Sequence, residues 1–249
     1  VNVFLKFQNF YANCLFEFIN DSLSCRLPLP ESIVSWKGVE HHREVIDEPS
    51  LHEGRIRSFK HERGNWATLV YLNYVPSQAM IKWMSSVLQD IPFKCNVMSD
   101  QLHISVTKSI ILKFHWIESF IQEVGKLCKN KNRFRLEFSN VREYCNAEKT
   151  RTFVGIECVE SSGTLNSFIT DLNSILVEYG LPPFYEDCSY HVSFLWCLGD
   201  ETASLRHITP MLTGKLNSFL VDHPEDQYIH VNEIFLKSGN QLYALKLKQ

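Results

Sequence analysis

Residues 184–198 read FYEDCSYHVSFLWCL, a turn-rich segment that runs into an apolar strand carrying one histidine. Side chains alternate between the two faces of a β-strand, so residues two apart point the same way. His191 and Ser193 are the polar pair of this strand, and the alternation places both on one face. The stretch therefore predicts a strand that presents an imidazole and a hydroxyl to the same ligand.

A second stretch has the same pattern. Residues 102–106 read LHISV, in which His103 and Ser105 again share one face of a predicted strand. In both places the histidine strand is followed by a helical pattern and then by further strands. We therefore predict two pseudo-symmetric lobes, each of which brings one H-x-S face to a central cleft.

Hydrophobic periodicity and turn residues predict the other elements. Ser77 suits the N-cap of one helix, Gly180 the end of another, and Thr209 and Pro210 the N-cap and first position of a third. Residues 238–240, Ser-Gly-Asn, indicate a hairpin. Further strands are predicted at residues 66–72, 134–138, 141–145, 152–156, 228–237 and 241–247. Strands and helices do not alternate strictly, which predicts an α+β fold with mostly antiparallel sheets rather than a doubly wound parallel sheet.

Composition limits the partners of such a protein. The chain has 249 residues, 45% of them hydrophobic and 21% charged, as in ordinary globular proteins. Its formal net charge of -3 provides no whole-protein attraction to nucleic acid, so RNA has to be recognised through a local basic groove. The sequence has no apolar run of about 18 residues, so we expect no membrane span.

The N-terminal part differs from the rest of the chain. Prolines and mixed charges occur between residues 25 and 54, which favours an extended or partly disordered leader over residues 1–54. The folded domain is expected over residues 55–249. His41 and His42 belong to the leader, and we interpret them as a solvated polar run because no further ligands lie at suitable spacing.

The eight cysteines are scattered along the chain. They form no C-x-x-C pair and no Cys/His cluster at zinc spacing. This pattern favours reduced, mostly buried thiols of an intracellular protein over a disulfide framework. We expect no metal and no cofactor.

Two H-x-S faces allow acid-base chemistry on a phosphate. An imidazole has both protonation forms available near neutral pH, so one histidine can act as base while the other acts as acid. Hydroxyls two residues away can hydrogen-bond the non-bridging oxygens of the phosphate. With RNA, one histidine takes the proton from the 2′-hydroxyl, which attacks phosphorus, and the other protonates the departing 5′-oxygen. The RNA product would end in a 2′,3′-cyclic phosphate.

The short pattern also has a structural interpretation, because a single strand histidine is often a hydrogen-bonded structural residue. A third match, His207-Ile208-Thr209, is followed by Pro210, which argues for a helix start instead of a paired strand. The pattern alone leaves the catalytic and the structural interpretation open.

Longer stretches carry a resemblance. They are GRIRSFKHERGNWAT at residues 54–68, LHIS at 102–105, FHWI at 114–117, EKTRTF at 148–153, the stretch at 184–198 with WCLGD at 196–200, and KSGN at 237–240. From Arg26 to the C-terminus the chain resembles the U6 small nuclear RNA phosphodiesterase family, a branch of the two-histidine (2H) phosphoesterases. The resemblance implies a bilobal α+β enzyme that trims the 3′ end of an RNA and leaves a cyclic phosphate or a 3′-phosphate. The substrate best known in the family is the oligouridine tail of the spliceosomal U6 RNA, which implies a nuclear protein. We expect a monomer.

Carried over by position, the resemblance implies that His103 and His191 are catalytic, with His191 as base and His103 as acid. Ser105 and Ser193 would bind the phosphate. The sequence itself does not determine which of the two histidines is the acid and which is the base.

Tyr185 matches the family's aromatic residue that stacks on a terminal base, and such stacking contributes roughly 1 to 3 kcal/mol per base. Its structural alternative is packing beside Phe184 and Pro183. Lys108, Lys149 and Arg151 are expected in an RNA groove, with a solvated surface as the alternative.

Two other functions remain open. One is a phosphodiesterase that only opens cyclic phosphates or cleaves 2′,5′ linkages, and the other is a catalytically silent RNA-binding protein. The first predicts no shortening of an oligouridine substrate, and the second predicts binding without turnover.

Overall fold

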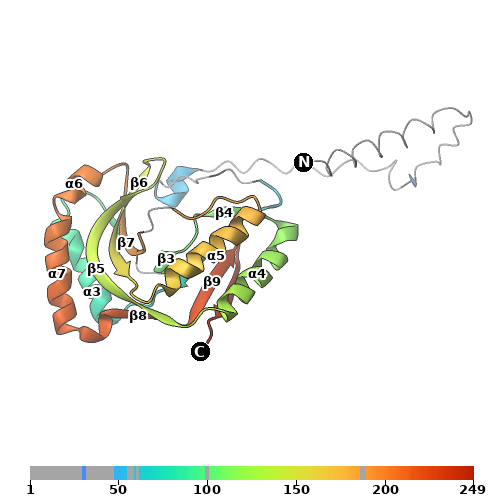
Figure 1. Cartoon of the computed structure of the whole chain (residues 1–249). Helices are drawn as coiled ribbons and strands as arrows, with labels where there is room; N and C mark the ends of the chain where they lie inside the picture. Colours follow the sequence, from blue (N-terminus) through green and yellow to red (C-terminus); the bar gives the residue numbers. More distant parts are fainter. Residues whose placement is uncertain (1–29, 32–47, 55–58, 60–61, 99–100, 186–188) are drawn as a thin grey trace, which may run out of the picture. The chain divides into compact units, whose positions relative to one another are not determined.

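The two histidine strands lie in two different antiparallel sheets of the computed structural model (Figure 1). The structure describes residues 30–31, 48–54, 59, 62–98, 101–185 and 189–249. The chain divides into two units, Val1–Glu44 and Val45–Gln249, and each strand that the structure describes belongs to the second unit. Most of the predicted leader lies outside the described residues, and near its end is a short 3-10 helix, η1 (Pro49–His52). The boundary at residue 55 stays a prediction.

The first sheet contains the strand of His103. Its order is β10-β9-β1-β3, and β4 also pairs with β1. Every pairing in this sheet is antiparallel. The strands are β1 (Asn65–Asn73), β3 (His103–Ser105), β4 (Ile110–Lys113), β9 (Glu233–Ser238) and β10 (Gln241–Lys246).

The second sheet contains the strand of His191. Its order is β2-β7-β6-β5-β8, again with antiparallel pairing throughout. The strands are β2 (Asn96–Val97), β5 (Phe134–Cys145), β6 (Arg151–Val159), β7 (His191–Leu198) and β8 (Tyr228–Val231). The predicted fold class, α+β with two lobes of antiparallel sheet, is confirmed.

The chain crosses between the sheets four times, before β2, after β2, before β5 and after β8. Strand β2 precedes His103 in sequence but pairs with β7 of the second sheet, whereas β9 and β10 end the chain and pair in the first sheet. The single strand predicted at residues 228–237 is therefore wrong, because β8 and β9 join different sheets on either side of Asn232. Both segments are apolar and alternating, so only their hydrogen-bonding partners distinguish them.

Helices cover one face of each sheet. Helices α6 (Thr202–Arg206) and α7 (Thr209–Asp222) pack against β5. Helix α3 (Gln78–Ser86) lies on the same side, since the ring of Trp83 is 5.5 Å from Phe194 of β7 and 5.9 Å from Phe219 of α7. Helix α4 (Ile117–Lys129) packs against β9 and β10, and α5 (Thr164–Glu178) packs against α4. Short 3-10 helices are η2 (Val87–Asp90), η3 (Phe114–Trp116) and η4 (Pro224–Asp226).

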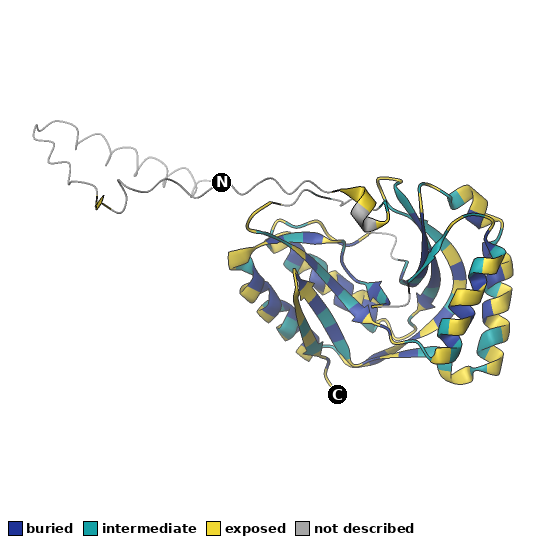
Figure 2. Cartoon of the chain, turned by 180° about the vertical axis from the view of Figure 1, so that it is seen from behind, coloured by how far each residue is buried: buried dark blue, intermediate teal, exposed yellow. Residues whose placement is uncertain are grey.

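Burial alternates along the strands, as the sequence predicted (Figure 2). On the helix-covered face, Leu72, Ile104 and Val192 are fully buried. On the opposite face, His103 and His191 are only half-buried. Helix packing therefore leaves the H-x-S face of each sheet available to a ligand.

Several predicted boundaries are confirmed or moved. Ser77 caps α3 by accepting a hydrogen bond from the Met80 N–H at 3.0 Å. The two strands predicted at 134–138 and 141–145 are one strand, β5, with a shift of register between Phe138 and Val141. Thr209 is the first residue of α7 rather than its N-cap, which is Ile208. In the part of the chain that the structure describes, no helix has both the length and the apolar character needed to span a membrane.

Candidate functional site

A bulge in β7 sets the faces of the second motif. Gly155 of β6 lies opposite Ser193, but the next residue, Val154, lies opposite Leu195, so Phe194 is an extra residue in β7. His191 and Ser193 share the open face with Glu157 and Gly155 of β6. Beyond the bulge, Leu195 joins Val154 on the buried face. The bulge thus combines an open polar face and a buried apolar segment in one strand.

The first motif is held by β1. His103 lies opposite Asn73, and Ser105 lies opposite Tyr71. The Tyr71 ring contacts the His103 ring edge-on, with centroids 5.2 Å apart. The Nδ1 of His103 is 2.8 Å from the carbonyl oxygen of Gln101. An N–H at Nδ1 donates to this carbonyl and leaves Nε2 for a substrate.

The second histidine is held in the same way. The Nδ1 of His191 is 2.8 Å from the carbonyl oxygen of Ser189, again two residues earlier in the chain. Both imidazoles therefore have their Nδ1 bound by the local backbone. In the neutral form this leaves the lone pair on Nε2, which is the atom that a general base needs.

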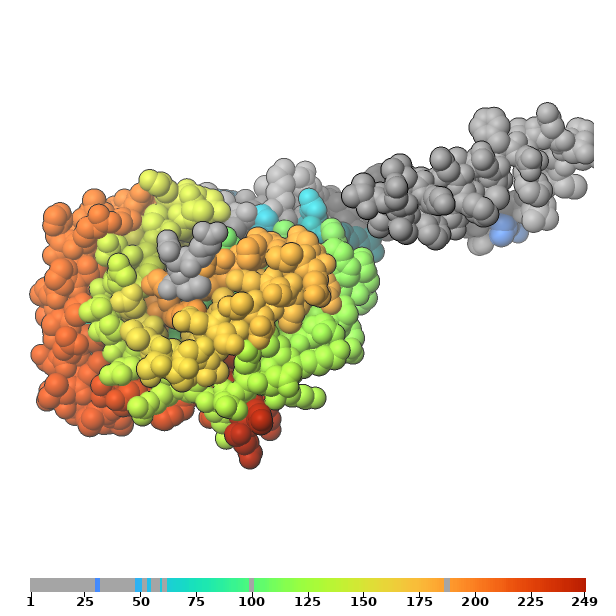
Figure 3. All heavy atoms as spheres, viewed as in Figure 1, coloured from blue at the N-terminus to red at the C-terminus, as the bar shows by residue number. Residues whose placement is uncertain are grey.

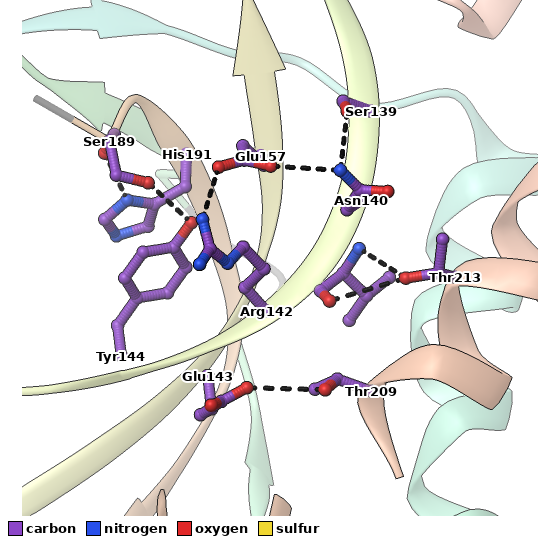
Figure 4. Close-up of polar contacts among 11 residues, drawn as sticks. Ser139, Asn140, Arg142, Glu143, Tyr144, Glu157, Ser189, His191, Thr209 and Thr213 are labelled. Atoms are coloured by element: carbon purple, nitrogen blue, oxygen red, sulfur yellow. Dashed lines mark hydrogen bonds and ion pairs between the residues drawn. The ribbon is translucent and has the colours of Figure 1, made fainter. Parts of the chain in front are cut away.

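Tyr144 of β5 contacts His191, which sequence analysis missed (Figure 4). The two rings are stacked, with centroids 3.5 Å apart and planes inclined by 11°. The Tyr144 hydroxyl shares a hydrogen bond of 3.0 Å with the Ser189 hydroxyl. A Cβ at Gly155 would lie 3.1 Å from both rings, so glycine leaves the room in which they stack. Tyr144 thereby restricts the orientation of His191.

The two histidines interact electrostatically. Strands β3 and β7 are in contact although they belong to different sheets. The pKa of His191 is lowered from 6.5, mainly because burial disfavours its charged form and also because of the charge of His103. The Ser189 carbonyl and the Glu157 carboxylate act in the opposite direction. The structure therefore brings the two predicted catalytic residues together and favours neutral His191.

Polar residues continue from His191 along the second sheet (Figure 4). Arg142 Nη1 donates to Glu157 Oε1 at 2.9 Å, and Asn140 Nδ2 donates to Glu157 Oε2 at 3.2 Å. Glu157 lies opposite His191 in the β6–β7 pairing. The carboxylate is thus held by two donors and contributes to the charge around the imidazole.

Tyr185 lies at an open groove of about 890 Å³. Residues of α5, Asn166 and Asn173 among them, form one side of the groove, and Arg142 and Glu157 lie at another. On the face shown in Figure 3, the surface is hollowed between α5 and β5. The Tyr185 side chain is 55% exposed, which leaves it available to a ligand.

Tyr185 contacts Phe184 and Lys108. Its ring is 5.3 Å from the ring of Phe184, in an edge-on arrangement, which agrees with the structural alternative. The Nζ of Lys108 lies 4.4 Å from the centre of the Tyr185 ring. Since Lys108 follows β3 and Tyr185 precedes β7, this cation–π contact joins the segments next to the two histidine strands.

The other two basic residues lie in different surroundings. Arg151 is in β6 at alternation with Phe153, Gly155 and Glu157, so it shares the face of His191, and its guanidinium is 5.5 Å from the Phe153 ring centre. Lys149 is in the turn before β6, is exposed, and forms an ion pair with Asp200 at 3.3 Å. Arg151 therefore has the better position for an RNA phosphate.

His207 and His223 have structural surroundings. His207 of the H-x-T match is the C-cap of α6, and α7 begins at Thr209, so the predicted helix start is confirmed. Among the described residues, His223, Glu225 and Asp226 have donor atoms within 4.8 Å of one another. Asp226 accepts a hydrogen bond of 2.6 Å from Ser77, the cap of α3, so this cluster has a structural explanation.

Comparisons with known proteins agree with the resemblance. Residues 27–246 match a family model described as "HVSL: Uncharacterised conserved protein". The protein named U6 snRNA phosphodiesterase 1 from Danio rerio is 34% identical over 233 residues, which are 91% of this chain and 82% of that protein. The Homo sapiens protein of the same name is 32% identical over 90% of this chain and 84% of its own length.

A solved structure agrees with the fold. Usb1 from Kluyveromyces marxianus superposes with a TM-score of 0.51 at 14% sequence identity, over 72% of this chain and 97% of that one. At this identity the likeness concerns the fold alone. The sequence matches cover both H-x-S strands and extend over most of both proteins. The chain therefore belongs to the U6 snRNA phosphodiesterase family.

Proposed function

We propose that this protein is a 3′–5′ exoribonuclease that trims the oligouridine tail of U6 snRNA and leaves a 2′,3′-cyclic phosphate. The observation that carries the proposal is the pair of imidazoles, His103 and His191, each held through Nδ1 and each followed by a serine on the same strand face. The names of the relatives support an RNA phosphodiester as substrate.

The reaction is an in-line transesterification. Nε2 of neutral His191 accepts the proton of the 2′-hydroxyl, whose oxygen attacks the neighbouring phosphorus. The bond from phosphorus to the 5′-oxygen breaks, and protonated His103 donates a proton to that oxygen. The terminal nucleoside leaves with a 5′-hydroxyl, and the shortened RNA keeps the cyclic phosphate.

The environment of His191 supports its role as base. Its lowered pKa keeps it neutral near pH 7, which is the form that accepts a proton. The hydroxyls of Ser105 and Ser193 lie on the same faces as the histidines and are suited to donate to the non-bridging oxygens. Each proton transfer is expected to contribute about 10² to 10⁴ in rate.

Binding of the RNA end involves the exposed Tyr185. A terminal base stacks on its ring, and Lys108, which now lies over that ring, moves to a phosphate. Arg151 provides a second positive charge on the face of His191. Because U6 RNA processing is nuclear, the proposal also implies a nuclear protein, acting as a monomer on an RNA 3′ end.

The test compares three alanine variants on a 5′-labelled RNA ending in oligouridine, with a chelator present. His103→Ala and His191→Ala are each expected to reduce trimming by at least about 10²-fold. His207→Ala is the matched control, because His207 belongs to an H-x-T match on a helix end, and it should trim at the rate of the unchanged protein.

The product end then decides among the functions. A 3′ end that resists phosphatase until acid opens it identifies the cyclic phosphate. An RNA of unchanged length with an opened cyclic end would replace the proposal by a cyclic phosphodiesterase. Full trimming by either catalytic-histidine variant would exclude the two-histidine mechanism.

A further inference from the structure

Two cysteines lie opposite each other where β2 pairs with β7. Asn96 lies opposite Trp196, and Val97 lies opposite Leu195. One more step in this antiparallel register places Cys95 opposite Cys197. The sequence showed no spacing pattern for this pair, because the two residues come from opposite ends of the catalytic region.

The hydrogen bonds of the same ladder define the type of pair. The Met98 N–H donates to the Phe194 carbonyl at 2.7 Å, so these residues form a hydrogen-bonded pair. Hydrogen-bonded and non-hydrogen-bonded pairs alternate, which makes Cys95 and Cys197 a non-hydrogen-bonded pair with Cα atoms about 4.5 Å apart. A disulfide bond needs Cα atoms about 4.4 to 6.8 Å apart. The register thus fits a cross-strand disulfide bond.

Both cysteines are free thiols. Cys197 is 2% exposed, whereas Cys95 is half-buried and accessible to a small oxidant. The Cys197 S–H donates to the Thr152 carbonyl at 3.6 Å. The neighbouring Cys197 is the main cause that lowers the pKa of Cys95, and Cys95 is the main cause that raises the pKa of Cys197. The accessible thiol is therefore also the one with the greater thiolate character.

We propose that Cys95 and Cys197 form a redox-modification site, at which a peroxide converts the two thiols into a disulfide bond. The Cys95 thiolate attacks one peroxide oxygen, the O–O bond breaks, and a sulfenic acid forms with release of water. The Cys197 sulfur then attacks the sulfenic sulfur and displaces the second water. Two thiols are oxidised and one hydrogen peroxide is reduced to two waters.

The bond would connect segments that lead to both histidines. Strand β2 has two residues and is the terminal strand of its sheet, and among the strands that the structure describes it pairs with β7 alone. The chain continues from β2 to β3 with His103, while β7 contains His191. The disulfide bond would fasten this short strand to β7 on the buried side of the sheet. This proposal does not depend on the reaction that the protein catalyses.

A third thiol provides the control. Cys145 lies opposite Thr152, and Thr152 lies opposite Cys197, so Cys145 and Cys197 share a row but are two strands apart. Two strand spacings are about 9.6 Å, too far for a disulfide bond. Cys145→Ser should therefore leave the bond intact, whereas Cys95→Ser should abolish it.

The experiment treats the reduced full chain with hydrogen peroxide, blocks remaining thiols by alkylation, and maps linked peptides by tandem mass spectrometry. We expect a Cys95–Cys197 link in the unchanged protein and in C145S, no such link in C95S, and reversal by dithiothreitol. Irreversible oxidation of Cys95 without a link, or a link from Cys95 to another cysteine, would overturn the proposal.

Thermal unfolding gives an independent readout. Since the register suits the bond, oxidation should raise the Tm of the unchanged protein and of C145S but not of C95S. A lower Tm on formation of the link would mean that the bond distorts the sheet, in contradiction to the register argument. Circular dichroism of C95S checks that the variant is folded.

Discussion

Tyr144 gives His191 an orientation that its own strand does not fully determine. The backbone carbonyl of Ser189 binds Nδ1, but one hydrogen bond allows the ring to tilt. The parallel Tyr144 ring, itself bound to the Ser189 hydroxyl, restricts that tilt. Burial raises the pKa of Tyr144 to about 12, so the hydroxyl stays protonated at neutral pH. We regard Tyr144 as a positioning residue.

Two substitutions of Tyr144 should distinguish the contribution of its ring from that of its hydroxyl. Tyr144→Ala is expected to lower kcat by about 10- to 100-fold with little change in KM, because a misplaced base loses reactivity before it loses affinity. Tyr144→Phe keeps the stacked ring and should restore most of kcat. Steady-state kinetics on oligouridine measures both, and a Phe variant as impaired as the Ala variant would contradict the role of the ring.

The environment of His191 also predicts the pH dependence of activity. The proposed reaction needs neutral His191, and burial lowers the pKa of this imidazole, so the acid limb of the kcat/KM profile should lie at lower pH than for an ordinary histidine. The Glu157 carboxylate favours the charged form and raises this pKa. Glu157→Gln should therefore lower the pKa of His191 and move the acid limb of the kcat/KM profile to lower pH.

A second carboxylate provides the comparison. Glu143 on β5 pairs with Arg206 of α6 at 3.1 Å and is not among the groups that shift the pKa of His191. Glu143→Gln should leave the acid limb in place. If the acid limb of the kcat/KM profile moved to higher pH in Glu157→Gln, the limb would report the titration of a group other than His191.

A glycine with a left-handed backbone forms the turn of the last hairpin. The hairpin between β9 and β10 turns at Gly239, whose φ of 58° is left-handed. A Cβ there would lie 2.6 Å from the Trp66 ring on β1. The sequence predicted the hairpin, because glycine suits this conformation, but not the close approach of Trp66.

Two glycine substitutions test this hairpin. Gly239→Ala is expected to reduce the free energy of unfolding by about 1 to 3 kcal/mol, from the left-handed backbone and the contact with Trp66. Gly214→Ala in α7, where a Cβ has open space, should increase it by up to about 1 kcal/mol. Denaturant titration of both variants measures the difference. Equal effects would mean that neither the left-handed backbone nor the contact with Trp66 penalises the added methyl group.

The local pattern of apolar and polar residues predicted most of the helices and strands. It missed the features that depend on the pairing of strands. The boundaries of β1 and α3 follow from β-branched residues and a serine cap. Strands β2 and β4 and helix α6 are short and have no periodicity of their own, so the sequence did not predict them. The bulge at Phe194 was also missed, because the strand reads as a continuous apolar run.

The arrangement of the two sheets brings the site together. Each half of the chain contributes strands to both sheets, since β2 joins the sheet of His191 and β9 and β10 join the sheet of His103. In each sheet, backbone hydrogen bonds therefore join strands from both halves of the chain, as in the β1–β9 and β2–β7 pairs. Strands β3 and β7, which are in contact, thus belong to sheets to which both halves of the chain contribute.

The sequence alone was sufficient to place His103 and Ser105 on one strand face, and His191 and Ser193 on another. Alternation of side chains along a strand depends only on neighbouring residues. Long-range pairing decided which side chains surround them. Tyr144, Glu157 and the Cys95–Cys197 pair come from segments far apart in sequence, and their contacts exist only when the strands are aligned in one register. No periodicity within a single strand encodes that register, since it follows from the packing of all the elements together.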